Sequence, residues 1–99
     1  MVKLIMTWDI QEGREQAYIE FAVGEFSPTL NGLGLQIREV WYTQAGSGPE
    51  MVVTGLMPTR RDAQELLNSS EWQLLRERLN EFVENVTVKV VKPHGPFQM

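Results

Sequence analysis

The chain of 99 residues contains no cysteine and only one histidine, His94. Without cysteine it can form no disulfide, no thiolate nucleophile and no cysteine-ligated metal site. A single histidine also excludes a multi-histidine metal site within one chain, and the paired carboxylates Glu12 and Glu15 belong to the solvated start of a predicted helix. We therefore expect no metal and no other cofactor.

Basic residues and long apolar runs are scarce as well. Nine Lys and Arg stand against 13 Asp and Glu, for a formal net charge of −4, whereas nucleic-acid binding requires clustered cations. No stretch approaches the roughly 20 apolar residues of a membrane span, and residues 1–6 are too short for the core of a signal peptide. We expect a cytoplasmic protein that binds neither nucleic acid nor membrane.

What the chain does contain is an ordered series of hydrophobic patterns. Four stretches alternate with the period of a strand and two regions carry apolar residues at helical spacing, in the order β-α-β-β-α-β. The strand stretches are residues 2–8, 35–44, 51–57 and 86–90. This order predicts an α+β, ferredoxin-like fold with a four-stranded antiparallel sheet and helices on one face. The length suits a single domain, residues 1–99.

Helix boundaries are marked by local signals. Ser27-Pro28 is expected to end the first helix, and residues 29–34, which include Asn31-Gly32, are expected to form a loop. Thr59 is placed to cap a helix that begins at Arg60. After a pause, Ser70 and Gln73 fit the capping box of a last helix.

Strand alternation assigns side chains to the two faces of the predicted sheet. The face covered by helices is expected to carry Glu39 together with Leu4, Met6, Trp8, Leu35, Ile37, Trp41, Met51, Val53, Val86, Val88 and Val90. The opposite face would carry Ile5, Thr7, Arg38, Val40, Tyr42, Val52, Thr54, Leu56, Lys89 and Val91. That mixture is too apolar to remain in water. A homodimer that stacks two such faces is therefore expected.

The chain resembles the dimeric α+β barrel superfamily, which includes antibiotic-biosynthesis monooxygenase-like, EthD-like and NIPSNAP-like proteins. The resemblance rests on the element order, on the turn 11–15 entering the first helix, and on residues 69–72 entering the last. It implies that two sheets pair into a barrel, with a ligand cleft in each subunit between sheet and helices. Haem-degrading members carry an Asn, a Trp and a His on the first strand, third strand and last helix. Here residues 2–8 contain no Asn, residues 51–57 no Trp and residues 72–83 no His, which argues against haem degradation.

Five residues are candidates for a functional site. Glu39 is the candidate catalytic residue, because a carboxylate beneath the helices would have a raised pKa and could act as a base. On the opposite face or at the sheet edge it would instead be solvated or paired with a cation. The candidate ligand-binding residues are Trp8, Trp41, Trp72 and Tyr18, which could line an aromatic pocket between sheet and helices or simply pack the core.

Two functions remain open at this point. The first is a homodimer that binds a small apolar or aromatic molecule between sheet and helices without catalysis. The second is a cofactor-independent monooxygenase or isomerase acting on a small aromatic or polyketide-like substrate, with Glu39 or Tyr42 handling a proton. Pro93 and Gly95 predict an irregular tail around His94, which could act as a base there only beside a partner, and Phe97 could contact the other subunit.

Overall fold

The computed structural model describes residues 1–43 and 45–92. The expectations for His94 and Phe97 lie outside the described residues. The elements follow one another as β1 (Val2–Ile10), α1 (Glu15–Phe21), the π-helical segment η1 (Ala22–Phe26), α2 (Ser27–Gly32), β2 (Gln36–Tyr42), β3 (Met51–Met57), α3 (Arg60–Asn68), α4 (Ser70–Leu79) and β4 (Val83–Val91). With each helical region divided into shorter helices, this is the expected β-α-β-β-α-β order.

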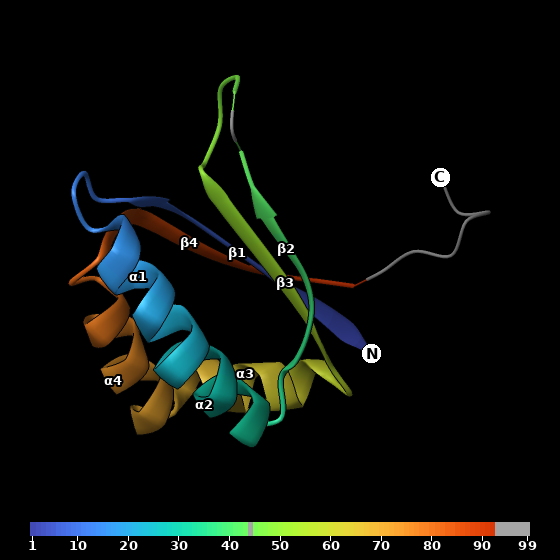
Figure 1. The fold of residues 1–99 in the computed structure, drawn as a ribbon. Helices are drawn as coiled ribbons and strands as arrows, with labels where there is room; N and C mark the ends of the chain where they lie inside the picture. The colour runs from blue at the N-terminus through green and yellow to red at the C-terminus, as the bar shows by residue number, and fades with distance from the viewer. Residues whose placement is uncertain (44, 93–99) are drawn as a thin grey trace.

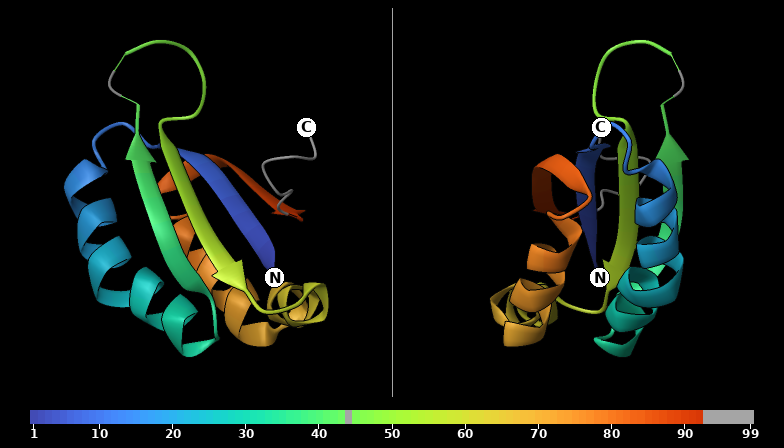
Figure 2. Two further views of the ribbon diagram at one scale, coloured as in Figure 1. Left: turned by 90° about the vertical axis from the view of Figure 1, so that its right-hand side faces the viewer. Right: turned by 60° about the vertical axis from the view of Figure 1, so that its left-hand side comes forward.

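The four strands form one sheet in the order β2-β3-β1-β4, and every neighbouring pair is antiparallel. All the helices lie on one side of this sheet (Figure 1), as the turned views confirm (Figure 2). The predicted α+β fold is therefore confirmed. Within the described residues, no helix is both long and apolar enough to cross a membrane. We call the side of the sheet without helices the open face.

The first helical region is longer than predicted. α1, η1 and α2 follow one another without a break from Glu15 to Gly32, so the expected stop at Ser27-Pro28 is wrong. The expected loop is wrong for residues 29–32, which are helical, whereas residues 33–34 form a turn. Pro28 falls in the first turn of α2. Pro28 directly follows the π-helical segment η1, where the regular helical hydrogen-bonding pattern is already interrupted, and its fixed φ suits the helical backbone.

The second helical region begins as predicted, with Thr59 accepting a hydrogen bond from the backbone N–H of Asp62 at 3.1 Å. The cap of α4, however, is Ser69, whose Oγ accepts from the N–H of Trp72 at 3.1 Å. The predicted capping box starting at Ser70 is therefore displaced by one residue. Ser69 takes the extended backbone conformation that a cap requires, with φ −75° and ψ 152°.

A β-bulge in β2 changes which residues face the helices. Ile37 pairs with Gly55 of β3, and the next pair in the register is Glu39 with Thr54, so that Arg38 is an extra residue in β2. Beyond this point the alternation is shifted by one position. The faces of all later residues in β2 are therefore opposite to those predicted from unbroken alternation.

The register identifies the two faces of β2 after the bulge. Val40 pairs with Val53, which pairs with the buried Met6 of β1 on the helix-covered face. Its neighbour Trp41 pairs with Val52 on the open face. By the same alternation Tyr42 faces the helices and Glu39 faces away from them. The prediction was wrong for all four residues of this segment.

Candidate functional site

Three of the predicted ligand-binding residues meet in the core between sheet and helices. Trp8 is 1% exposed, Tyr18 5% and Trp72 3%. Trp8 Nε1 donates a hydrogen bond to the Tyr18 hydroxyl at 3.1 Å. The centroid of the Phe26 ring lies 5.5 Å from that of Trp8 and 6.5 Å from that of Trp72. These rings fill the space in which the sequence predicted a pocket. Burial raises the pKa of Tyr18, and the hydrogen bond from Trp8 acts in the opposite direction.

The fourth predicted ligand-binding residue is separated from the other three by the sheet. Trp41 lies on the open face, opposite Val52, and 61% of it is exposed. A tryptophan normally buries most of its large apolar surface. Trp41 is thus a large aromatic side chain exposed on the open face. It cannot line one cleft together with Trp8, which lies on the other side of the sheet.

Glu39 also lies on the open face, and its surroundings differ from those predicted. Its Oε1 accepts hydrogen bonds from Thr54 Oγ1 at 3.2 Å and from Lys3 Nζ at 3.4 Å. The hydrogen bond from Lys3, followed by that from Thr54, lowers the pKa of Glu39, and the side chain of Trp41 adds a smaller effect in the same direction. The expectation of a raised pKa is therefore wrong. At neutral pH this carboxylate is ionised and serves as a partner for Lys3.

A shallow cavity of about 330 Å³ adjoins Glu39 on the open face and is lined by Lys3, Arg38, Glu39 and Leu56. Arg38 reaches it because a bulge can turn two consecutive side chains to the same side of a strand. Sequence reasoning did not associate Lys3 or Arg38 with Glu39. The alternation of β1 puts Lys3 on the open face, but only the register between three strands brings it to Glu39.

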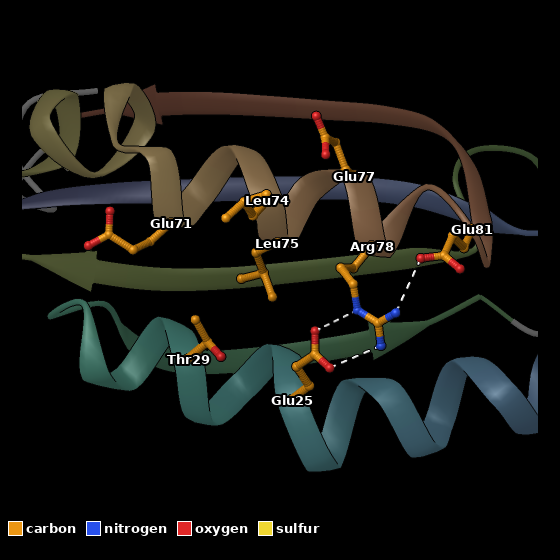
Figure 3. A pocket seen from close by; sticks show the side chains of 8 residues that line it. All are labelled: Glu25, Thr29, Glu71, Leu74, Leu75, Glu77, Arg78 and Glu81. Atoms are coloured by element: carbon orange, nitrogen blue, oxygen red, sulfur yellow. Dashed lines mark hydrogen bonds and ion pairs between the residues drawn. The ribbon is translucent and has the colours of Figure 1, made fainter.

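A second hollow lies between α4 and the helices that precede β2 (Figure 3). Its volume is about 520 Å³, and its lining combines Leu74, which is 62% exposed, with several carboxylates. Arg78 of α4 spans the hollow and donates two hydrogen bonds to Glu25 of η1, at 2.9 and 3.0 Å, and one to Glu81 at 3.3 Å (Figure 3). The Arg78 contact lowers the pKa of Glu25. This arrangement ties two helices together.

The part of the chain that the structure describes brings no group of metal-ligating side chains together. Within residues 1–43 and 45–92, no three His, Asp or Glu side chains come together as a group that could hold a metal ion. The chemistry available on the open face is instead that of two cations, one carboxylate, a buried hydroxyl from Thr54 and an exposed indole. Such a set offers charged hydrogen-bonding groups and an aromatic surface to a ligand.

Comparison with known proteins extends only to the fold. No family model matches the chain, and no curated protein matches its sequence. Its structure is similar to that of an uncharacterised NIPSNAP domain protein from Burkholderia xenovorans, with a TM-score of 0.72, 16% identity, and coverage of 98% of this chain and 97% of the other. An EthD family protein from Bacillus halodurans gives a TM-score of 0.75 at 18% identity, with coverage of 95% and 99%.

A third similar structure comes from Nitrosomonas europaea and is described, provisionally, as an antibiotic-biosynthesis monooxygenase. It has a TM-score of 0.68 and 13% identity, and the match covers 94% of this chain and 98% of the other. At such identities a match shows a shared fold and carries no activity with it. The ferredoxin-like fold of the NIPSNAP, EthD and monooxygenase-like proteins is thus the fold of this chain, as its resemblance implied.

Proposed function

We propose that the protein is a homodimer, joined through the open faces of its two sheets, that binds a small aromatic molecule beside Trp41. The observation that carries this proposal is the position of Trp41, which is 61% exposed on a sheet face that no described helix covers. Exposed tryptophans that gather with other apolar side chains mark interaction surfaces.

The open face has the composition expected of a self-complementary surface. Its apolar side chains are Ile5, Trp41, Val52, Leu56 and Val91, and they come from four strands that lie side by side (Figure 2). The same face carries cations and the carboxylate of Glu39, so that a two-fold axis could bring unlike charges together. A second copy of this chain is therefore the partner that we propose.

We place the ligand on the open face because side chains fill the space between the sheet and the helices. An aromatic molecule between sheet and helices would have to displace Trp8, Tyr18 or Trp72 from a packed core, and such overpacking destabilises a fold. Because β2 is an edge strand, Trp41 would lie at the margin of the proposed interface, where its indole can contact the second copy and still stack on an aromatic ring. In this proposal Glu39 remains ionised and orients Lys3, with no proton-transfer step assigned to it.

Two neighbouring residues provide a matched test of the dimer. Trp41 and Val40 are 61% and 58% exposed, yet they lie on opposite faces of β2. We expect Trp41→Asp to weaken dimerisation at least about 30-fold, because a tryptophan in an interface commonly contributes about 2 kcal/mol or more. Val40→Asp, the control, should leave the association constant within about threefold of that of the unchanged protein. Sedimentation equilibrium over a range of concentrations measures both.

The proposal fails if Trp41→Asp still sediments as a dimer, or if the unchanged protein is monomeric at concentrations where such interfaces assemble. Equal weakening by both substitutions would assign the effect to the edge strand as a whole and not to the open face. Circular dichroism melting curves of the variants distinguish a lost interface from a lost fold.

A further inference from the structure

We infer that the cavity at the β2 bulge binds the anionic group of a small aromatic carboxylate, with Lys3 and Arg38 as its cationic partners and the ring of the ligand beside Trp41. This inference rests on the proposed function, since it names the ligand class of the same open face. It differs from that proposal in depending on charge, which can be tested separately from dimerisation.

The bulge is what creates the site. In a regular strand consecutive side chains point to opposite faces. Arg38 and Glu39 are consecutive, yet both line the same cavity of about 330 Å³ together with Lys3 and Leu56. The extra residue therefore adds a guanidinium to a face that already carries an ammonium group. Bulges often occur next to functional sites because they redirect one side chain in this way.

The cavity carries more positive than negative charge, unlike the chain as a whole. Its lining includes two cations and one carboxylate, whereas the formal net charge of the chain is −4. Glu39 accepts from both Lys3 and Thr54, and the Lys3 contact is long, at 3.4 Å. Arg38 takes part in none of the ion pairs found among the described residues. Cationic hydrogen-bonding capacity therefore remains for an incoming anion.

The other groups at the cavity restrict what kind of anion would fit. A guanidinium donates two parallel hydrogen bonds to a carboxylate, which gives directional recognition. Leu56 provides an apolar wall, and Trp41 follows Glu39 by two positions on the same face, close enough for the two side chains to interact. The volume of about 330 Å³ is at the lower end of small-molecule sites. An aromatic ring bearing one carboxylate satisfies all of these features.

The test compares two probes of nearly equal shape, one an anionic carboxylate and the other a neutral amide in which NH2 replaces one carboxylate oxygen. Indole-3-acetate and indole-3-acetamide have nearly the same shape, and their binding to the full chain is measured by calorimetry and by amide shifts in nitrogen-15 spectra. We expect the carboxylate to bind at least about tenfold more tightly, since hydrogen bonds to charged groups exceed neutral ones by about that factor. The largest shifts should fall on residues 38–41 and 54–56.

Two substitutions complete the design. Arg38→Gln should weaken indole-3-acetate binding about tenfold and leave indole-3-acetamide binding unchanged, and Lys3→Gln should act in the same direction. Arg60→Gln is the matched control, because Arg60 is an exposed arginine at the start of α3, outside this cavity. It should change neither affinity by more than about twofold.

Each result has a defined meaning. Equal affinities for the two probes, shifts confined to other residues, or unchanged acetate binding in Arg38→Gln would overturn the inference. If the protein sediments as a dimer and shows no preference for the carboxylate, the anion site fails and the dimer stands. If a monomeric protein discriminates between the probes and loses that discrimination in Arg38→Gln, the anion site stands and the dimer fails.

Discussion

At the scale of single residues, Gly55 in the middle of β3 is the described glycine at which an added Cβ would meet its neighbours most closely. Gly55 pairs with Leu4 and with Ile37, so a side chain here would point to the helix-covered face. A Cβ atom at this position would lie 2.7 Å from Leu35 Cδ1 and 2.8 Å from Leu35 Cγ. Leu35 is 1% exposed, so it belongs to the packed core. The absence of a side chain at Gly55 is therefore what lets Leu35 pack against the sheet.

Gly55→Ala should destabilise the protein by about 1–3 kcal/mol, the usual cost of adding an atom to a packed core. Gly32→Ala is the control, because a Cβ there meets nothing within 4 Å and Gly32 ends a helix. Its effect should be within about 1 kcal/mol and favourable, since alanine restricts the unfolded chain. Urea unfolding measures both changes. Equal stability of the two variants would show that Leu35 can repack without cost.

At the scale of whole elements, the start of α4 shows how one hydroxyl can determine where a helix begins. The Ser69 Oγ both accepts from the Trp72 N–H at 3.1 Å and donates to the Leu66 carbonyl at 2.6 Å. It therefore satisfies groups at the end of α3 and at the start of α4. Because Trp72 and Leu75 of α4 are buried in the core, this junction positions the helix over the sheet.

Ser69→Ala should destabilise the protein by about 1 kcal/mol, which is typical of a lost N-cap. Ser70→Ala is the matched control: its hydroxyl contacts only the exposed Glu71 side chain, so the effect should stay within about 0.5 kcal/mol. Denaturant midpoints of the two variants provide the comparison. If Ser70→Ala proved the more damaging, the capping box predicted from sequence would be the better description of this helix start.

The same elements show what could be predicted from sequence and what could not. The alternation in β1 is uninterrupted from residue 2 to residue 8, and Leu4, Met6 and Trp8 are all buried as expected. The alternation in β2 looked equally regular. One extra residue at position 38 reversed the faces of Glu39 and Trp41, and no feature of the residue types marks that insertion.

The candidate site was predicted less accurately than the fold, because the site depends on the register between strands. The sequence shows that Lys3, Arg38 and Trp41 are present, but not that they share a site. Lys3 reaches Glu39 only because β1 and β2 both pair with β3 in particular registers. Similarly, Tyr18 was predicted to bind a ligand together with the three tryptophans, whereas its hydrogen bond from Trp8 in the core follows from helix placement. Pairing across strands is long-range information that local periodicity does not contain.

At the scale of the whole molecule, three carboxylates with lowered pKa values join elements distant in sequence. A hydrogen bond from Asn85 lowers the pKa of Asp9 and links β1 to β4, and Arg78 does so for Glu25, linking η1 to α4. Lys3 lowers the pKa of Glu39 and links β1 to β2. A carboxyl whose pKa is lower in the folded state favours folding as long as it stays ionised.

The free energy of unfolding should therefore decrease on acidification. The unfolded state takes up protons first as the pH falls below 3.8 for Asp9 and 4.5 for Glu25 and Glu39, and the stabilisation is lost as the pH passes through the lower folded-state values. Urea unfolding at about pH 7, 4 and 3 and one protein concentration measures this. Arg78→Met should reduce the pH dependence by removing the partner of Glu25. A stability independent of pH in this range would contradict the assignment.

The bulge at Arg38 also determines how this chain can be aligned with others of its fold. The three structural matches described above share only 13% to 18% identity, a range in which residue-by-residue correspondence must be inferred from position along each strand. A partner strand that lacks the extra residue would require a one-position gap at Arg38. Without that gap, Trp41 would be matched with a residue on the helix-facing side, and any role assigned to it by analogy would belong to the wrong side of the sheet.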